Sequence, residues 1–179
     1  PCPNLNPNSI FKKRNAPKKE IIIFVLNIQC LRAHMVELEY HLELHKPHIV
    51  LLQETWLDAS TESVSIANYI VISRRDRSEK TNRGGVLTLA RSDFNRLVHI
   101  ENSKVEERSW HFLHVDPEIL LLGNWYRPGA TEHDAYAALQ EEMGTHVLEA
   151  TGIILSGDLN VHHARWLRFS NATQCKDLV

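Results

Sequence analysis

Apolar residues run together at both ends of the chain, and these runs predict buried strands at 21–26, 48–53 and 153–155. Continuous runs of branched aliphatic residues are typical of strands that are covered on both faces. Between the first two runs, apolar residues recur at helical spacing, at Leu31, Met35, Leu38 and Leu42, and Pro47 ends the predicted helix. A strand, a helix and a strand in this order predict a parallel pair joined by a right-handed crossover.

The middle of the chain has a different pattern, in which short strand candidates are separated only by loops. These candidates are 69–73, 85–90, 96–100, 110–115 and 119–126. They predict antiparallel hairpins, and Asp116-Pro117-Glu118 predicts a tight turn between the last two. A capping box at 131–134 then opens a helix with an apolar face of Tyr136, Leu139, Met143 and Val147. The whole pattern predicts an α/β sandwich of two mixed sheets with helices outside.

Length and composition indicate one globular domain. The chain has 179 residues, of which 43% are hydrophobic and 23% charged, and a chain of this size buries a substantial core. The longest apolar run is too short to cross a bilayer, and the first residues contain no apolar stretch of the secretory kind. Cys2, Cys30 and Cys175 are odd in number and scattered. They predict neither a disulfide framework nor a zinc site, and they favour a reducing compartment.

Charge is distributed unevenly. The formal net charge is −2, but residues 1–20 carry five Lys and Arg against one Glu, or +4, which leaves −6 for the remainder. We expect 1–19 to be a disordered basic leader and 20–179 to form the folded domain. The leader is either a phosphate-attracting arm or nuclear import signal, which would make the protein nuclear, or a solvated tail. The negative remainder argues against a general nucleic-acid binder.

One internal segment is basic. Residues 72–96 contain seven Arg and Lys against three acidic residues. Arg74, Arg75 and Arg83 are therefore candidates to follow a phosphate backbone, and the alternative is an ordinary solvated loop. Gly84-Gly85 lacks the following Lys-Ser/Thr and helix of a P-loop, and predicts a tight entry into a strand instead.

Polar side chains stand at the ends of four predicted strands. Asn27, Glu54 and Tyr126 each follow an apolar run, and Asp158 and Asn160 follow the last one. Alternate residues of a strand share a face, so Asp158 and Asn160 should point to the same place. A carboxylate beside a carboxamide is suited to orienting a water molecule and a phosphate oxygen.

Each of the other three residues also has a structural explanation. Glu54 is well placed to bind Mg²⁺, which is satisfied by one or two carboxylates plus waters and phosphate oxygens, or it caps the following turn. The Tyr126 phenol donates to a phosphate oxygen, or its ring lies at the edge of the core. Asn27 taken alone is more typical of a strand-end turn. Together, however, these strand-end residues favour a functional site.

Five motifs, in this order, resemble the endonuclease/exonuclease/phosphatase superfamily. They are Leu26-Asn-Ile28, Gln53-Glu-Thr-Trp56, Arg83-Gly-Gly-Val86, Asn124-Trp-Tyr-Arg-Pro128 and Gly157-Asp-Leu-Asn160. The stretch Gly157-Asp-Leu-Asn-Val-His-His-Ala-Arg-Trp166 is most similar to the apurinic-type endonuclease domain of non-LTR (LINE-like) retrotransposons. The resemblance covers residues 20–172.

The resemblance implies a four-layered α/β sandwich that cuts DNA phosphodiesters with Mg²⁺, or with Mn²⁺ in its place. Glu54 would bind the metal with Asn27 nearby, and Asp158 would orient or deprotonate the attacking water. Asn160 would hold the phosphate, and Tyr126 would hydrogen-bond to it. These roles agree with phosphoryl chemistry, in which positioning and charge neutralisation supply most of the acceleration.

The resemblance also implies partners. DNA would be the substrate, and Arg127 would join Arg74, Arg75 and Arg83 as a nucleic-acid contact. A reverse transcriptase domain would accompany this domain in a parent polyprotein. No membrane is implied.

Two departures from the family pattern stand out. Gln29 occupies a position where members often carry an acidic residue or Asn, and the family's later strands and Ser-Asp-His motif do not occur before Val179. We therefore expect a domain that is incomplete at its C-terminal side and impaired in cleavage. The alternatives are a catalytically inactive remnant that binds nucleic acid or a partner, and a phosphatase or phosphodiesterase of the same fold.

Overall fold

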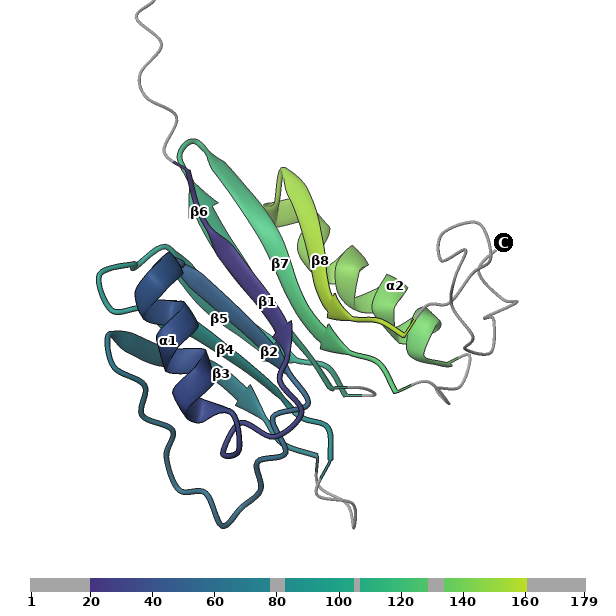
Figure 1. Cartoon of the computed structure of the whole chain (residues 1–179). Coiled ribbons are helices and arrows are strands. Elements are labelled where there is room, and N and C mark those ends of the chain that lie inside the picture. Colours follow the sequence, from purple (N-terminus) through teal and green to yellow (C-terminus); the bar gives the residue numbers. More distant parts are fainter. Residues whose placement is uncertain (1–19, 78–82, 105–106, 129–133, 161–179) are drawn as a thin grey trace, which may run out of the picture.

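A computed structural model describes residues 20–77, 83–104, 107–128 and 134–160, and these form two four-stranded sheets (Figure 1). In the first sheet the strand order is β1-β2-β4-β3. The strands are β1 (Ile23–Asn27), β2 (Ile49–Gln53), β3 (Tyr69–Arg75) and β4 (Val86–Arg91). β1 and β2 are parallel, which confirms the prediction from the strand–helix–strand pattern, whereas β4 is antiparallel to β2 and β3. The predicted basic leader lies outside the described residues.

The second sheet has the strand order β5-β6-β7-β8. Its strands are β5 (Leu97–Asn102), β6 (Glu107–Val115), β7 (Glu118–Tyr126) and β8 (Gly152–Asp158). The first three are antiparallel neighbours, and Asp116 and Pro117 form the predicted tight turn between β6 and β7. β7 and β8 are parallel. Each sheet is therefore mixed and contains one parallel pair.

Two helices cover the outer faces, so the predicted four layers are confirmed (Figure 1). Helix α1 (Met35–His45) packs on the first sheet through Leu38 and Leu42. Helix α2 (Asp134–His146), followed by the short 3₁₀ helix η1 (Val147–Glu149), lies on the second sheet. A second core fills the space between the sheets and includes Ile49, Leu51, Ala90, Leu113 and Leu122. No helix in the described ranges is long and apolar enough to span a membrane.

An ion pair anchors α2 to the second sheet. Arg108 of β6 is fully buried, and its Nε donates to Glu142 Oε2 of α2 at 2.9 Å. Trp110 Nε1 donates to the same carboxylate at 2.7 Å, and the guanidinium lies 4.6 Å from the ring centroid of Trp125. A buried charge needs this degree of pairing, because an unpaired one costs several kcal/mol. The side chains of β6 and β7 therefore fix where α2 lies.

The expectation that all the middle strands form hairpins is wrong at one step. β3 pairs with β4, and β5 pairs with β6, but β4 and β5 belong to different sheets. Phe94 lies in the short connection between them and is buried in the core between the sheets together with Leu97. The apolar connection is thus held at the end of the sandwich, where it joins the two sheets.

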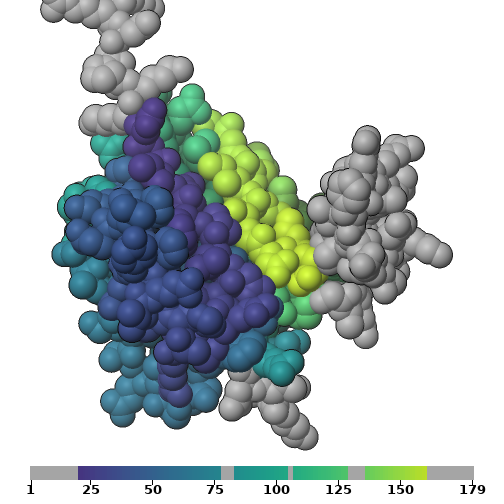
Figure 2. Space-filling view, viewed as in Figure 1, coloured from purple at the N-terminus to yellow at the C-terminus, as the bar shows by residue number. Residues whose placement is uncertain are grey.

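β1 and β8 each have a strand neighbour on one side only among the described residues. The two strands contact one another across the sandwich, and both reach the surface on the face shown in Figure 2, β1 in purple and β8 in yellow. At the β1 edge, Ile22 and Val25 are exposed. Along β8, every residue is partly exposed. This face therefore combines two sheet edges with partly exposed apolar side chains.

Candidate active site

The site is formed where the two parallel pairs end. Asn27 and Gln53 are register partners at the carboxyl ends of β1 and β2, and Tyr126 and Asp158 are partners at the ends of β7 and β8. Because parallel strands bring their carboxyl ends to one edge, each pair presents its last residues together. The contact between β1 and β8 then joins the two pairs at one end of the sandwich.

Asn27 connects two carboxylates that are far apart in the sequence. Its Nδ2 donates to Glu54 Oε1 at 2.8 Å and to Asp158 Oδ2 at 2.8 Å. Asn27 Oδ1 is buried and accepts no hydrogen bond. Because both carboxylates are half-buried, they remain accessible from solvent. The structure therefore brings together Asn27, Glu54 and Asp158 in one cluster.

Glu54 is held in an unusual backbone conformation. Its φ is 52° and that of Trp56 is 53°, both in the left-handed region that non-glycine residues rarely adopt. The segment is fixed from both sides, because Cys30 N–H donates to Glu54 O at 2.9 Å and Trp56 N–H donates to Gly84 O at 3.0 Å. Trp56 Nε1 also donates to Glu54 Oε2 at 3.2 Å. The carboxylate is thus oriented by Asn27 on one oxygen and by Trp56 on the other.

Asp158 ends β8, and Asn160 is placed by the turn that follows. Asn160 has φ 46°, its N–H donates to Asp158 Oδ1 at 3.1 Å, and its Nδ2 donates to Arg127 O at 2.7 Å. The expected strand alternation therefore does not position Asn160, because the strand stops at Asp158. An amide NH₂ group carries two donors, and the described residues accept only one of those of Asn160.

Gly157 is required by the backbone just before Asp158. Its φ is 134°, and a Cβ at this position would lie 2.0 Å from the carbonyl oxygen of Trp125 on the neighbouring strand. Any side chain would therefore force β8 away from β7. The glycine of the Gly-Asp-Leu-Asn motif allows the close approach that places Asp158 beside Tyr126.

Tyr126 faces the interior of the site next to three carboxylates. Burial, followed by the charge of Glu54 and a hydrogen bond to it, raises the pKa of Tyr126 to about 12, and Asp158 and Glu107 add to the shift. Its phenol therefore stays a protonated donor well into the alkaline range. This is the state that a phosphate oxygen requires of a hydrogen-bond donor.

Glu107 is a carboxylate of this site that the sequence analysis missed. It is buried at the start of β6 opposite Tyr126, and its Oε1 lies 3.3 Å from Arg77 Nε. The apolar pattern predicts a strand that begins only at Trp110, because the three preceding residues are Glu107, Arg108 and Ser109. Those polar residues are buried through cross-strand and helix contacts, which apolar periodicity does not reveal.

A buried polar network lies one residue beneath the site. Gln53 Nε2 donates to Asn124 Oδ1 at 2.7 Å, and Asn124 Nδ2 donates to Thr88 Oγ1 and to Leu87 O, both at 3.2 Å. Gln53 precedes Glu54, and Asn124 lies two residues before Tyr126. The network therefore ties the two sheets together directly below the residues that meet at the site.

The four candidate nucleic-acid arginines lie in different surroundings. Arg83 is exposed and its guanidinium lies 5.6 Å from the ring centroid of Trp56. Arg74 is paired with Asp76 and donates to the backbone of the 58–61 segment, and Arg75 is half-buried on β3. Arg127 is 4% exposed, and its Nη1 donates to Leu159 O and Asn160 O at 3.3 and 3.4 Å.

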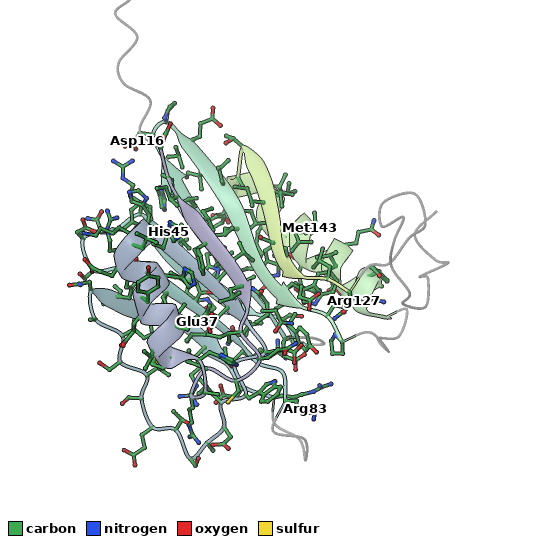
Figure 3. The ribbon with its side chains drawn as sticks, viewed as in Figure 1. Glu37, His45, Arg83, Asp116, Arg127 and Met143 are labelled. Atoms are coloured by element: carbon green, nitrogen blue, oxygen red, sulfur yellow. The ribbon has the colours of Figure 1, made fainter. Side chains whose placement is uncertain are left out.

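Arg127 therefore supports the backbone of residues 158–160, which carries Asp158 and Asn160. Its guanidinium lies 5.1 Å from the ring centroid of Tyr136 on α2, and its backbone N–H donates to Asp158 O at 2.9 Å. A direct contact between this side chain and DNA would require the packing against α2 to open. Arg83 and Arg127 lie toward the same end of the sandwich in Figure 3, whereas Asp116 lies at the opposite end.

The side chains present fit a divalent cation of the Mg²⁺ type. Glu54 and Asp158 converge on Asn27 Nδ2, and the oxygen of the same amide is buried and accepts no hydrogen bond from the described residues. In the described ranges no group of three or more His, Cys, Asp and Glu could hold a metal. Mg²⁺ does not need such a group, because it is bound by one or two carboxylates together with waters and substrate phosphates.

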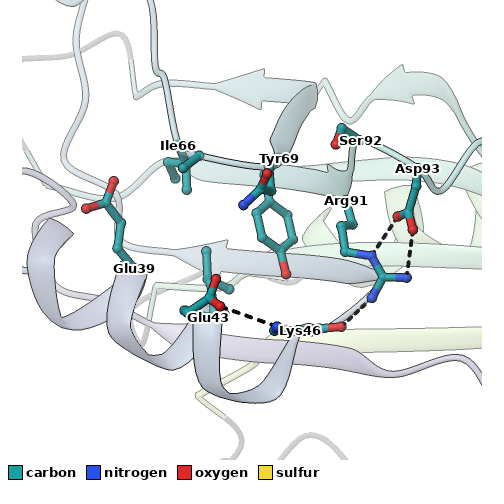
Figure 4. A pocket seen from close by; sticks show the side chains of 11 residues that line it. Glu39, Glu43, Lys46, Ile66, Tyr69, Arg91, Ser92 and Asp93 are labelled. Atoms are coloured by element: carbon teal, nitrogen blue, oxygen red, sulfur yellow. Dashed lines mark hydrogen bonds and ion pairs between the residues drawn. The ribbon is translucent and has the colours of Figure 1, made fainter.

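A separate pocket of about 610 Å³ lies at the other end of the first sheet, between α1 and the β3–β4 hairpin (Figure 4). Arg91 Nε lies 2.6 Å from Asp93 Oδ1, and Lys46 Nζ lies 3.3 Å from Glu43 Oε1. The Tyr69 hydroxyl donates to a backbone carbonyl. These two ion pairs occupy Glu43 and Asp93, so the pocket lacks the converging carboxylates found at the strand ends.

Solved structures share this fold. An AP endonuclease from Leishmania major is 20% identical with a TM-score of 0.63, over 79% of this chain and 55% of its own. The endonuclease domain of TRAS1, a telomere-specific non-LTR retrotransposon, is 14% identical with a TM-score of 0.58, over 82% and 63%. A Neisseria 3′ phosphatase bound to a product DNA hairpin is 17% identical with a TM-score of 0.57, over 79% and 58%.

This chain therefore spans between half and two thirds of the length of these structures. None of the curated protein sequences matches it. The sequence profile of the Endonuclease/Exonuclease/phosphatase family, however, matches residues 25–174, which include every strand-end residue of the site. The match covers most of the chain, and the two mixed sheets agree with it. The chain belongs to the Endonuclease/Exonuclease/phosphatase family.

Proposed function

We propose that this chain is a metal-dependent DNA endonuclease domain that hydrolyses phosphodiester bonds, with Mg²⁺ or Mn²⁺ as its cofactor. The observation that carries the proposal is the Asn27 amide, which donates to both Glu54 and Asp158. Such an arrangement keeps two carboxylates side by side without a permanent cation between them. It suits a site that takes up a divalent cation and a phosphate together.

Each side chain has a task in this proposal. Glu54 would hold the metal with Asn27 nearby, and the metal would neutralise charge that develops on the phosphate. Asp158 accepts a proton from the attacking water and orients it. Asn160 and Tyr126 donate hydrogen bonds to the phosphate oxygens, and the pKa of Tyr126, raised to about 12, keeps its phenol protonated even in alkaline solution. Preorganised donors of this kind typically contribute about 10²–10³ each to the rate.

We also propose that the domain comes from a non-LTR retroelement, acts on DNA in the nucleus and is accompanied there by a reverse transcriptase domain. The Gly-Asp-Leu-Asn motif and the fold shared with the TRAS1 endonuclease domain support this origin. A second candidate is DNA or partner binding without cleavage, which the exposed Arg83 beside Trp56 would also serve. A third is phosphatase activity, which the shared fold of the Neisseria 3′ phosphatase supports.

Nicking of supercoiled plasmid in Mg²⁺, compared with the same reaction in EDTA, separates these candidates. We expect Mg²⁺-dependent nicking that Glu54→Gln and Asp158→Asn each reduce by at least about 10². Glu118→Gln is the matched control, because Glu118 bonds to Thr151 at the far end of β7. Release of phosphate from a 3′-phosphorylated oligonucleotide without nicking would favour the phosphatase. DNA binding with neither reaction would favour the inactive remnant.

A further inference from the structure

We propose that Trp56 and Arg83 form a nucleotide subsite beside Glu54, which rests on the proposed action on DNA. In this subsite Arg83 binds the phosphate next to the scissile one, and the exposed part of the Trp56 indole contacts the attached sugar or base. The ligand class is a nucleotide unit of a DNA strand. We refer to these two side chains as the Trp56–Arg83 pair.

The position of Trp56 points to a task beyond packing. Trp56 is only half-buried, although its backbone has the costly left-handed φ of 53°. That conformation turns the indole toward the site, where Nε1 reaches Glu54 Oε2 at 3.2 Å. A large aromatic ring is thus held at the entrance to the carboxylate cluster rather than in either core.

Arg83 is the uncommitted cation at this entrance. Its side chain is exposed, and in the part of the chain that the structure describes it makes no hydrogen bond or ion pair besides its contact with the Trp56 ring. The neighbouring Arg77 differs, because it is paired with Glu107. Figure 3 shows Arg83 extending from the end of the molecule where the site lies. A guanidinium in this position is free to form bidentate contacts with a phosphate.

The negative charge of the site explains why a cation at its entrance would favour DNA binding. Glu107 is paired with Arg77, which leaves Glu54 and Asp158 at the strand ends as the carboxylates that repel an approaching polyanion. A guanidinium at the entrance offsets this repulsion and attracts the adjoining phosphate. The indole adds an apolar surface on which a sugar or base packs without regard to sequence. Stacking against the ring also holds the guanidinium in place before the DNA arrives.

Trp56 links this subsite to the metal-binding carboxylate. One edge of the indole donates to Glu54, and its face carries Arg83. A nucleotide that presses on the ring therefore acts on the orientation of Glu54 as well. By linkage, DNA bound at the Trp56–Arg83 pair and metal bound at Glu54 should strengthen one another.

The test measures binding of a labelled DNA duplex in EDTA at several salt concentrations, with nicking in Mg²⁺ measured separately. We expect Arg83→Gln to weaken binding and to lower the slope of log affinity against log salt by about 0.9, with Arg83→Lys restoring the slope. Trp56→Leu should weaken binding about tenfold. Trp56→Phe keeps the ring but loses the indole N–H, so it should bind DNA normally and require more Mg²⁺ for nicking.

Arg96→Gln is the matched control for charge, because Arg96 lies beside Asp116 at the opposite end of the sandwich. The proposal is overturned if Arg83→Gln and Arg96→Gln lower the affinity equally while Trp56→Leu leaves it unchanged. It is also overturned if the parent chain does not bind DNA. Nicking by a parent chain whose Arg83 and Trp56 variants bind normally would reject the subsite alone. Binding that depends on Arg83 without any nicking would reject the endonuclease and retain the subsite.

Discussion

At the scale of single residues, the site depends on a neutral amide placed between two anions. The carboxylates of Glu54 and Asp158, which bind the same amide group, repel one another. A Lys or Arg between them would offset their charge and exclude a metal ion. Asn27 instead gives one N–H to each and carries no charge. Both carboxylates are therefore oriented, and the attraction for a divalent cation is preserved.

Tyr126 provides a prediction with a defined pH range. Its pKa is raised from 10.0 to about 12 in the folded chain, so the folded state holds this proton more tightly than the unfolded state. The stabilisation is complete below pH 10 and is lost as the pH rises toward 12. Urea unfolding below pH 10 and near pH 12 should show a larger loss of stability for the parent chain than for Tyr126→Phe. An equal loss in both would contradict the placement of Tyr126 beside the carboxylates.

At the scale of elements, the apolar runs are sufficient to predict the strands that lead to the site, although β8 continues past the predicted 153–155 to Asp158. Val50, Leu51 and Leu52 are buried on both faces of β2, which ends at the buried polar residue Gln53, and Glu54 follows. Sequence patterns do not reveal the cross-strand partners. Glu107 and Asn124 are buried polar residues whose contacts come from other strands, so their burial has no local signal.

The burial of the Arg127 side chain is likewise not visible in the sequence. The family resemblance implies a nucleic-acid contact for this arginine. In the structure Tyr136 of α2 covers it, and its guanidinium bonds to the backbone after Asp158. Only the packing of α2 on the second sheet determines this, and no pattern within residues 124–128 carries that information.

A substitution of Gly157 tests how closely β8 must approach β7. Gly157→Ala should destabilise the chain by about 1–3 kcal/mol from the backbone conformation alone, because φ is 134°. Its Cβ would also lie 2.0 Å from Trp125 O, so Asp158 should move and nicking should fall. Gly144→Ala on α2 is the matched control, since nothing lies within 4 Å of its Cβ. Gly144→Ala should stabilise the helix by about 0.5–1 kcal/mol. Equal thermal stability of Gly157→Ala and the parent chain would contradict this close approach.

At the scale of the whole molecule, the site and the two free sheet edges lie on neighbouring parts of the same sandwich. β1 contributes Asn27 and β8 contributes Asp158 to the site, and each strand has one unpaired side among the described residues. Unpaired edges with exposed apolar side chains tend to pair with other chains. The arrangement that brings Asn27 to Asp158 therefore also leaves a surface prone to association.

We accordingly expect the 179-residue chain to self-associate in solution. Ile22→Lys, at an edge position that is 46% exposed, should reduce the association, because a charged side chain disfavours strand pairing at an edge. Val36→Lys is the control for the added charge, since Val36 is 82% exposed on the helix α1 and not on a strand. Light scattering over a range of protein concentrations measures the effect. A monomeric parent chain with one sharp, cooperative thermal transition would show that the edges are harmless.

The central claim is that Glu54 holds a divalent cation in the cluster organised by Asn27. Titration with Mn²⁺, followed by the electron paramagnetic resonance of the free ion and by competition with Mg²⁺, measures this directly. Glu54→Gln should weaken Mn²⁺ binding by at least about tenfold, whereas Glu118→Gln at the far end of β7 should bind as the parent chain does. If Glu54→Gln binds Mn²⁺ as tightly as the parent chain, Glu54 does not hold the metal.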